Sequence, residues 1–251
     1  LIKELNMKSS RRNFLKAGVL TGIGISVAPK LTFGTVKNNE KVRIAFIGVG
    51  NRGRNHLNNF LRRDDVIIPA VCDTDQFALD RTAEMFNKFD KPAPIYYTGS
   101  EYAFMDLLAR NDIDGVVIST PWLWHTRMAV ATMKAGKHVG VEVSAANTIE
   151  ECWDLVSTYE ETGKHCMILE NVCYRKDVMA VLQMVREGLF GEILHARCGY
   201  QHDLRRVKFS RGRQPDGGKL EYGVNAMGEA RWRTEHSLQR NGDLYPTHGA
   251  G

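Results

Sequence analysis

A glycine-rich turn between a buried strand and a helix constrains the fold of this chain more than any other sequence feature. The run Lys41–Ile47 is mostly apolar and rich in β-branched residues, which predicts a buried parallel strand. The hexapeptide Gly-Val-Gly-Asn-Arg-Gly at 48–53 follows at once, and a helical pattern begins behind it. Glycines in this arrangement permit a tight turn, close approach of the backbone to a diphosphate, and close helix–strand packing. The pattern predicts the first strand–turn–helix unit of a dinucleotide-binding domain.

A second predicted strand, Val66–Cys72, ends at Asp73, twenty residues after Gly53. A carboxylate at this position accepts hydrogen bonds from the ribose hydroxyls of a bound dinucleotide. Residue 74 is a threonine and not an arginine that would receive a 2′-phosphate, so we expect NAD as the cofactor. The alternative is that Asp73 only caps the following helix.

Predicted strands and helices alternate as far as residue 169, which predicts an α/β fold with a doubly wound parallel sheet, the Rossmann arrangement. Ligands bind such sheets at the carboxyl ends of the strands. The expected elements are a helix over Tyr102–Leu108, a strand at Gly115–Thr120, a loop at Pro121–His125, a helix at Thr126–Ala135, a short strand ending at Glu142, a helix at Ile149–Thr162 with Trp153, Leu155 and Val156 packed inward, and a strand at His165–Leu169.

Composition and charge exclude several classes of protein. Hydrophobic residues make up 43% of the chain and charged residues 25%, which excludes disorder, collagen and a small disulfide scaffold. The formal net charge is +5, but residues 1–39 alone carry +6, so the rest carries −1 and offers no basic footprint for nucleic acid. The five cysteines have no metal-ligand spacing, so we expect free thiols and no metal site.

The basic N-terminal segment resembles an export signal. Arg11 and Arg12 precede an uncharged run, Ala17–Ala28, whose twelve residues would span only about 18 Å as a helix. The hydrocarbon core of a membrane is about 30 Å thick, so we expect no stable membrane span. Paired arginines before a short, mildly apolar run indicate a twin-arginine (Tat) leader over residues 1–39 and a periplasmic or secreted protein.

The first half of the chain resembles the glucose–fructose oxidoreductase/inositol dehydrogenase (Gfo/Idh/MocA) family. The resemblance rests on the glycine turn at 48–53, on Thr120-Pro121 followed by His125, and on Ala-Gly-Lys-His-Val at 135–139 leading to an acid. That family usually has Glu-Lys-Pro after the strand, and its lysine often assists hydride transfer. Here the triplet is Glu142-Val143-Ser144, so the lysine is missing.

The departures from that pattern resemble one branch, glycoside hydrolase family 109, whose members are NAD-dependent α-N-acetylgalactosaminidases, often with Tat leaders. The shared motifs are Asn51–Gly53, Trp122–His125, Glu142–Ser144, Glu170–Tyr174, Gly199–Asp203 and Asn241–Gly249. Proteins of this branch continue for well over a hundred residues past the last motif. The resemblance therefore implies a dinucleotide-binding domain at 40–165 and the start of an incomplete α+β substrate domain, with an open β-sheet, at 166–251.

The resemblance implies a reaction in which a tightly bound NAD⁺ takes hydride from C3 of the sugar, a base removes the proton at C2, and the C1 substituent is eliminated. Water then adds at C1 and the hydride returns, with no net redox change. His248 is the expected base at O3 and Tyr200 the expected proton-transfer group at C2 or the leaving oxygen. The implied partner is a glycan with terminal α-N-acetylgalactosamine. The resemblance leaves open whether the protein forms a homo-oligomer.

The implied site residues fall into two sets. The cofactor-binding residues are Gly48, Gly50, Asn51, Arg52, Gly53, Asp73, Trp122, Leu123, Trp124, His125, Glu142, Val143 and Asn171. The substrate-binding residues are Tyr200, Arg233, Tyr245, Pro246, Thr247 and His248.

Each assignment has a plainer alternative. His248 could bond only a backbone carbonyl, Tyr200 could be a core or edge residue of a strand, and Arg233 could face solvent. Trp122 and Trp124 could be ordinary core residues. For the whole protein, the alternatives are a sugar dehydrogenase with dissociable NAD⁺ and a cofactor-binding protein without turnover.

The leader makes a direct prediction about export. Replacing Arg11 and Arg12 by lysine should leave the protein in the cytoplasm, because the twin-arginine route reads the arginine pair. Cell fractionation measures this, with the Lys30→Arg, Lys37→Arg variant as the control that keeps the pair. Periplasmic recovery of the double lysine variant would show that the leader is not a twin-arginine signal.

Overall fold

The strand predicted ahead of the glycine turn is β1 (Val42–Ile47), which lies in the middle of a parallel sheet in the computed structural model. The structure describes residues 41–202, 229–240 and 247–248, within a unit that runs from Lys41 to Gly251. The leader expected at 1–39 lies outside the described residues. No helix that the structure describes has the length and hydropathy of a membrane span.

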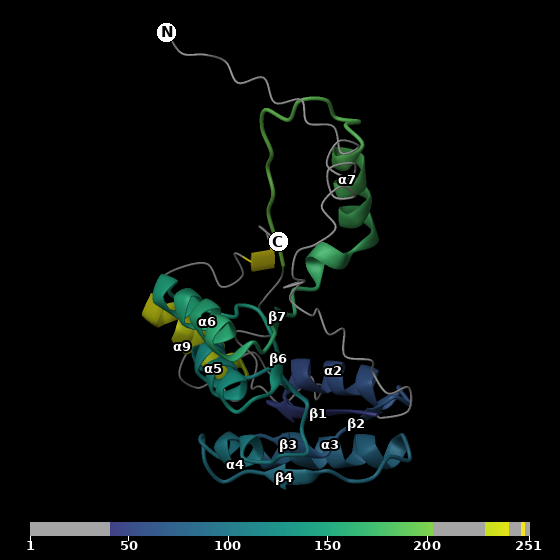
Figure 1. Ribbon diagram of the computed structural model, residues 1–251, viewed down its shortest axis with the longest axis vertical. Helices are drawn as coiled ribbons and strands as arrows, with labels where there is room; N and C mark the ends of the chain where they lie inside the picture. The colour runs from purple at the N-terminus through teal and green to yellow at the C-terminus, as the bar shows by residue number, and fades with distance from the viewer. Residues whose placement is uncertain (1–40, 203–228, 241–246, 249–251) are drawn as a thin grey trace, which may run out of the picture. The chain divides into compact units, whose positions relative to one another are not determined.

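Seven strands form one parallel sheet in the described part of the chain (Figure 1). Its order is β4-β3-β1-β5-β6-β7, and β2 also pairs with β1. The chain runs outward from β1 in one direction and then returns to β5 on the other side of β1, so the order reverses between these two strands. The remaining strands are β2 (Val66–Ile67), β3 (Ala70–Cys72), β4 (Ile95–Tyr97), β5 (Gly115–Ile118), β6 (His138–Val141) and β7 (Cys166–Ile168).

Helices cover both faces of the sheet, which confirms the doubly wound Rossmann-like fold (Figure 1). Along β1, Phe46 packs on one face with α2 and α3, while Ala45 and Ile47 pack on the other with α4, α5 and α6. The alternation follows from the period of two residues in a strand. The helices are α2 (Asn51–Leu61), α3 (Gln76–Lys88), α4 (Phe104–Leu108), α5 (His125–Lys134), α6 (Ile149–Thr162), α7 (Lys176–Arg186) and α9 (Glu229–Arg240), with short 3₁₀ turns η1 (Trp122–Trp124) and η2 (Val172–Tyr174).

Two glycines of the turn are required by contacts and not only by flexibility. Gly48 has φ +83°, and a Cβ there would lie 2.7 Å from the carbonyl carbon of Ser119, which follows β5. A Cβ on Gly53, in the first turn of α2, would overlap the carbonyl oxygen of Gly48. Side chains at these positions would therefore separate β1, β5 and α2 at the point where they meet.

The strand predicted at 66–72 is broken into β2 and β3. Pro69 interrupts it, because proline has no N–H for the sheet ladder. β2 pairs with the start of β1 and β3 with its end.

Two elements went unpredicted between Asp73 and residue 102. Helix α3 begins at an N-cap made by Asp75, whose side chain accepts from the N–H of Phe77 at 3.0 Å. Strand β4 has only three residues and follows Pro92 and Pro94, which are unfavourable in strands and obscured its pattern.

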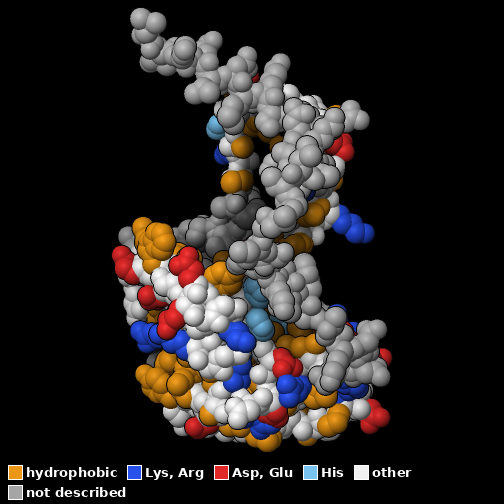
Figure 2. Space-filling view, in the orientation of Figure 1, with side chains coloured by type: hydrophobic (Ala, Val, Ile, Leu, Met, Phe, Trp, Pro, Cys, Tyr) orange, Lys and Arg blue, Asp and Glu red, His pale blue; other side chains and the backbone are white. Residues whose placement is uncertain are grey.

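Helix α6 has the predicted bounds, but two of its residues were placed on the wrong face. Leu155 and Thr158 are buried, whereas Trp153 is 65% exposed and Val156 is also exposed. α6 packs against α5 through a narrow stripe, so only one residue per turn is covered. Figure 2 shows hydrophobic side chains on the surface over α6, among acidic ones.

The part of the chain after β6 differs from expectation in two ways. The parallel sheet continues past residue 165, because β7 at 166–168 pairs with β6. Beyond β7 the described residues form η2, α7 and α9 and no strand. Tyr200, which we expected on a strand, therefore lies outside regular secondary structure. The open β-sheet expected for the second domain is not found among the described residues.

Candidate functional site

A cavity of about 320 Å³ opens at the carboxyl ends of the strands, where the strand order reverses between β1 and β5. This is where open α/β sheets bind ligands. The sequence-predicted residues that line it are Gly48, Gly50, Arg52, Asp73, Trp122, Trp124, His125, Glu142, Val143 and Arg233. The other predicted residues that the structure describes, namely Asn51, Gly53, Leu123, Asn171, Tyr200, Thr247 and His248, are not part of its wall. Tyr245 and Pro246 lie outside the described residues.

Asp73 connects the end of β3 to the glycine turn. One carboxylate oxygen accepts from the N–H of Val49 at 2.7 Å, and the other accepts from the N–H of Asp75 at 2.9 Å. Burial raises the pKa of Asp73 more than these backbone donors lower it. The helix cap of α3 is Asp75, so Asp73 is not the mere N-cap of the alternative interpretation.

The cavity wall has the features that a dinucleotide diphosphate requires. Gly50 is the N-cap of helix α2, which has no side-chain cap and no acidic residue in its first turn. Its N-terminus therefore presents backbone donors and a partial positive charge to an anion. Ser119, which also lines the cavity, has a buried hydroxyl with no hydrogen-bond partner among the described residues. A buried hydroxyl of this kind needs a partner, and a ligand oxygen in the cavity would supply one.

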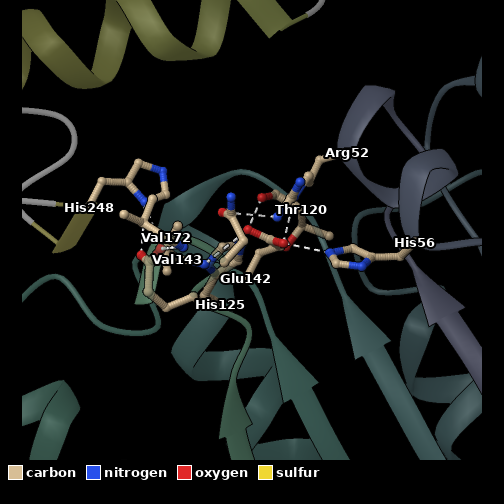
Figure 3. Close-up of polar contacts among 10 residues, drawn as sticks. Arg52, His56, Thr120, His125, Glu142, Val143, Val172 and His248 are labelled. Carbon is tan, nitrogen blue, oxygen red and sulfur yellow. Dashed lines mark hydrogen bonds and ion pairs between the residues drawn. The ribbon is translucent and has the colours of Figure 1, made fainter. Parts of the chain in front are cut away.

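Glu142 is a buried carboxylate held by an arginine and a histidine side chain of α2 (Figure 3). Its Oε1 lies 2.7 Å from Nε of Arg52 and 2.5 Å from Nε2 of His56. Arg52 also donates to Oδ1 of Asn171 at 3.3 Å, which joins α2, β6 and the segment after β7. Burial raises the pKa of Glu142, but the hydrogen bonds from His56 and Arg52 outweigh it and hold the pKa below its ordinary value.

His56 was missed by the sequence analysis, although a signal for it existed. It stands four residues after Arg52 on α2, and this spacing places both side chains on one face of the helix. Two such residues next to the glycine turn favour a shared acidic partner, but the partner comes from β6 and only the folded sheet brings it there.

The tryptophans after β5 form two separate aromatic groups. Trp122 is 4% exposed, and its ring contacts Trp232 and His236 of α9 at centroid distances of 5.0 and 4.9 Å. Trp124 contacts Tyr102 and Phe104 instead. Both tryptophans are thus packed in aromatic contacts while also lining the cavity.

Arg233 lies over the aromatic group of Trp122, with its guanidinium carbon 5.3 Å from that ring and 4.4 Å from the ring of Trp232. It is half-buried and does not simply face solvent. Leu123, between the two tryptophans, is exposed.

His125 is buried between two backbone carbonyls. Its Nδ1 lies 2.8 Å from the oxygen of Ser144, and its Nε2 lies 2.8 Å from that of Thr120. Burial lowers the pKa of His125. The ring therefore links the loop after β5 to the loop after β6 and fixes the cavity wall.

The two predicted catalytic residues lie together. The rings of Tyr200 and His248 have centroids 4.8 Å apart, with 50° between their planes. His248 Nδ1 also lies 2.8 and 3.0 Å from the two carboxylate oxygens of Glu170. A carboxylate is therefore a partner of His248. The sequence motif Glu170–Tyr174 contains Glu170 but assigns it no role, and its position just after β7 is the signal that points to it.

Comparisons with known proteins agree with this architecture. Residues 42–170 match the family described as "Oxidoreductase family, NAD-binding Rossmann fold", and residues 174–251 match "Glycosyl hydrolase 109, C-terminal domain". The chain is 49% identical over 266 aligned residues to an alpha-N-acetylgalactosaminidase of Tannerella forsythia, covering 98% of this chain and 57% of that protein. It is 52% identical over 215 residues to a glycosyl hydrolase family 109 protein of Stenotrophomonas maltophilia, covering 84% of this chain and 47% of that protein. The chain thus spans about half the length of the curated relatives it matches.

Solved structures share the fold at low sequence identity. Myo-inositol 2-dehydrogenase from Lactobacillus plantarum superposes with a TM-score of 0.54 at 21% identity, covering 63% of this chain and 45% of that one. Scyllo-inositol dehydrogenase from Lactobacillus casei, solved with NAD(H) and scyllo-inositol, gives a TM-score of 0.53 at 20% identity, covering 61% and 43%. These similarities show the fold alone.

The Glu142 cluster predicts a pH-dependent contribution to stability. The pKa of Glu142 is depressed in the folded chain from its ordinary value of 4.5, so its stabilisation is present above pH 4.5 and is lost as the pH falls through the folded pKa. Glu142→Gln should lower the free energy of unfolding by about 1–3 kcal/mol at pH 7. We expect the lower part of that range because Arg52 is 38% exposed.

Urea unfolding of both proteins at pH 7 and below pH 4 measures this, and the difference should shrink at the lower pH. The exposed Glu84→Gln on α3 is the matched control and should change stability by no more than about 0.5 kcal/mol. A Glu142→Gln difference that is independent of pH would contradict the ion-pair interpretation.

Proposed function

Because this chain belongs to the oxidoreductase family with the NAD-binding Rossmann fold and is a glycosyl hydrolase 109 protein, we propose that the protein containing it is a glycosidase that releases terminal α-linked N-acetylgalactosamine with NAD as catalyst. The observation that carries the proposal is the cavity at the reversal of strand order, lined by the turn at 48–53 and by Asp73. The 49% identity to an alpha-N-acetylgalactosaminidase supports the substrate class.

The residues of the cavity fit NAD better than NADP. The uncapped N-terminus of α2 and the hydroxyl of Ser119 suit the diphosphate, and Asp73 suits the adenosine ribose. Thr74 and Asp75 line the cavity next to Asp73. The carboxylate of Asp75 would repel the 2′-phosphate of NADP. Arg52 and Glu142 also line the cavity, and Arg52 in turn holds Asn171, a set of side chains that suits the nicotinamide end.

NAD⁺ held by these residues would supply an acceptor for the C3 hydride of the sugar, and its reduced form would supply the hydride that restores C3. His248 removes the proton from O3 as C3 becomes a ketone. The ketone acidifies the C2 hydrogen, and Tyr200, in ring contact with His248, transfers the proton at C2 or at the leaving oxygen. Val143 stands where a lysine would assist simple dehydrogenation, which favours return of the hydride over net oxidation.

The partner of the protein is then a glycan that ends in α-linked N-acetylgalactosamine. Paired arginines ahead of an uncharged run support export by the twin-arginine route, which carries folded proteins and so suits a protein that binds its cofactor before export.

The cofactor assignment predicts the effect of removing the Asp73 carboxylate. Asp73→Ala should weaken NAD(H) binding about 10- to 100-fold, because charge-assisted hydrogen bonds contribute about 1.5–3 kcal/mol. Titration calorimetry measures this, with Asp80→Ala on the exposed surface of α3 as control. Thermal unfolding of both variants checks that the glycine turn is intact. Unchanged NAD(H) affinity in folded Asp73→Ala would remove Asp73 from the cofactor site.

The mechanism predicts isotope exchange at C2. The protein containing this chain, supplied with p-nitrophenyl N-acetyl-α-galactosaminide in D₂O, should release N-acetylgalactosamine with deuterium at C2 and should not accumulate NADH. His248→Ala should slow the reaction about 10²- to 10⁴-fold, the usual contribution of a general base. His195→Ala, a change at an exposed histidine, is the control.

Two outcomes would contradict the proposed mechanism. Hydrogen fully retained at C2 would indicate direct displacement in place of elimination. Stoichiometric NADH with an oxidised sugar would indicate a dehydrogenase.

A further inference from the structure

A carboxylate that the proposed chemistry does not use is held against His248. The side chains of Glu170 and His248 are each only 11% exposed. His248 Nδ1 lies 2.8 Å from Oε2 and 3.0 Å from Oε1 of Glu170, so both oxygens face the same ring nitrogen. Figure 3 shows His248 beside Val172, the residue whose N–H fixes the carboxylate.

Glu170 is itself held in place by the backbone. Its Oε1 accepts from the N–H of Val172 at 2.6 Å, and it stands two residues after the last strand of the sheet. The carboxylate is therefore an anchored acceptor, and the imidazole is the group whose orientation is set by the contact.

An ionised carboxylate can only accept hydrogen bonds, so Nδ1 of His248 must be the donor in this contact. In a neutral imidazole the second nitrogen, Nε2, then carries the lone pair. When Nε2 takes a proton, the ring becomes a cation, and the adjacent carboxylate stabilises it. This is the arrangement that orients a histidine base in nucleophilic hydrolases.

We propose that Glu170 is a positioning residue that keeps the proton of neutral His248 on Nδ1 and so makes Nε2 the nitrogen that accepts the proton from the substrate. The role of Nε2 as a base rests on the proposed function. The choice of tautomer does not, because it follows from the contact between Glu170 and His248 alone.

The competing interpretation is that Glu170 only supports the turn η2 through Val172. Glu170→Gln separates the two. Glutamine has nearly the same shape, and its carbonyl oxygen still accepts from the N–H of Val172, but its amide also presents a donor to His248. If Glu170 only supported η2, Glu170→Gln would leave the tautomer of His248 unchanged.

The test measures the tautomer of His248 directly by NMR in this chain, labelled with ¹⁵N at its histidine rings. The chain has eight histidines, and the signal of His248 is identified by its loss in His248→Gln. The wild-type chain should show mainly the Nδ1–H tautomer at a pH where the ring is neutral. In Glu170→Gln the ratio of Nδ1–H to Nε2–H should fall about tenfold, as expected for loss of a charge-assisted hydrogen bond. Glu192→Gln, at an exposed position, should leave the ratio unchanged. An unchanged ratio in folded Glu170→Gln would overturn the proposal.

A second measurement uses the protein containing this chain and its activity on the α-galactosaminide. Glu170→Gln should lower kcat by about 10²-fold or more with little change in KM, because a base in the wrong tautomer cannot take the proton. Glu170→Asp, which restores a carboxylate, should recover part of the loss. A shifted tautomer ratio with unchanged kcat would overturn the positioning role. Absence of glycosidase activity in the wild-type protein would overturn the proposed function and leave the tautomer result standing.

Discussion

The close approach of Gly48 to the peptide between Ser119 and Thr120 is the constraint on which the site depends. A Cβ at Gly48 would lie within 2.8 Å of three backbone atoms there, so only glycine lets β1 and β5 end side by side at the point where the strand order reverses. The same turn directs α2 so that its uncapped N-terminus faces the cavity. The cavity, the buried hydroxyl of Ser119 and the wall after β5 all follow from this contact.

Three carboxylates then hold the surroundings of the cavity, each placed just after a parallel strand. Asp73 follows β3 and holds the glycine turn through the N–H of Val49. Glu142 follows β6 and holds the first turns of α2 through Arg52 and His56. Glu170 comes after β7 and holds His248. Because parallel strands end at one edge of the sheet, acids from three distant parts of the sequence lie along that edge.

These three acids have different electrostatic surroundings. Asp73 accepts only backbone donors, and burial leaves its pKa raised. Glu142 faces an arginine and a histidine, which hold its pKa low in spite of burial. The acid at the predicted ribose position is thus satisfied by backbone dipoles, whereas the acid at the predicted nicotinamide end is satisfied by an arginine and a histidine side chain. The cavity therefore has distinct ends before any ligand is considered.

The sequence by itself determined the fold class and singled out two side chains that the folded chain brings into contact. The periodicity of β1, β5 and β6 and the glycine turn are local properties, so they predicted the Rossmann-like sheet, and the family motifs singled out Tyr200 and His248 together. Local patterns did not reveal the break at Pro69, the short strand β4, or the face of α6 that is covered, because these depend on which neighbour each segment meets. Only the tertiary structure joined Glu142 to His56 and Glu170 to His248, which are 86 and 78 residues apart. Pairings over such distances are decided by strand order, and strand order is a property of the whole sheet and not of any one segment.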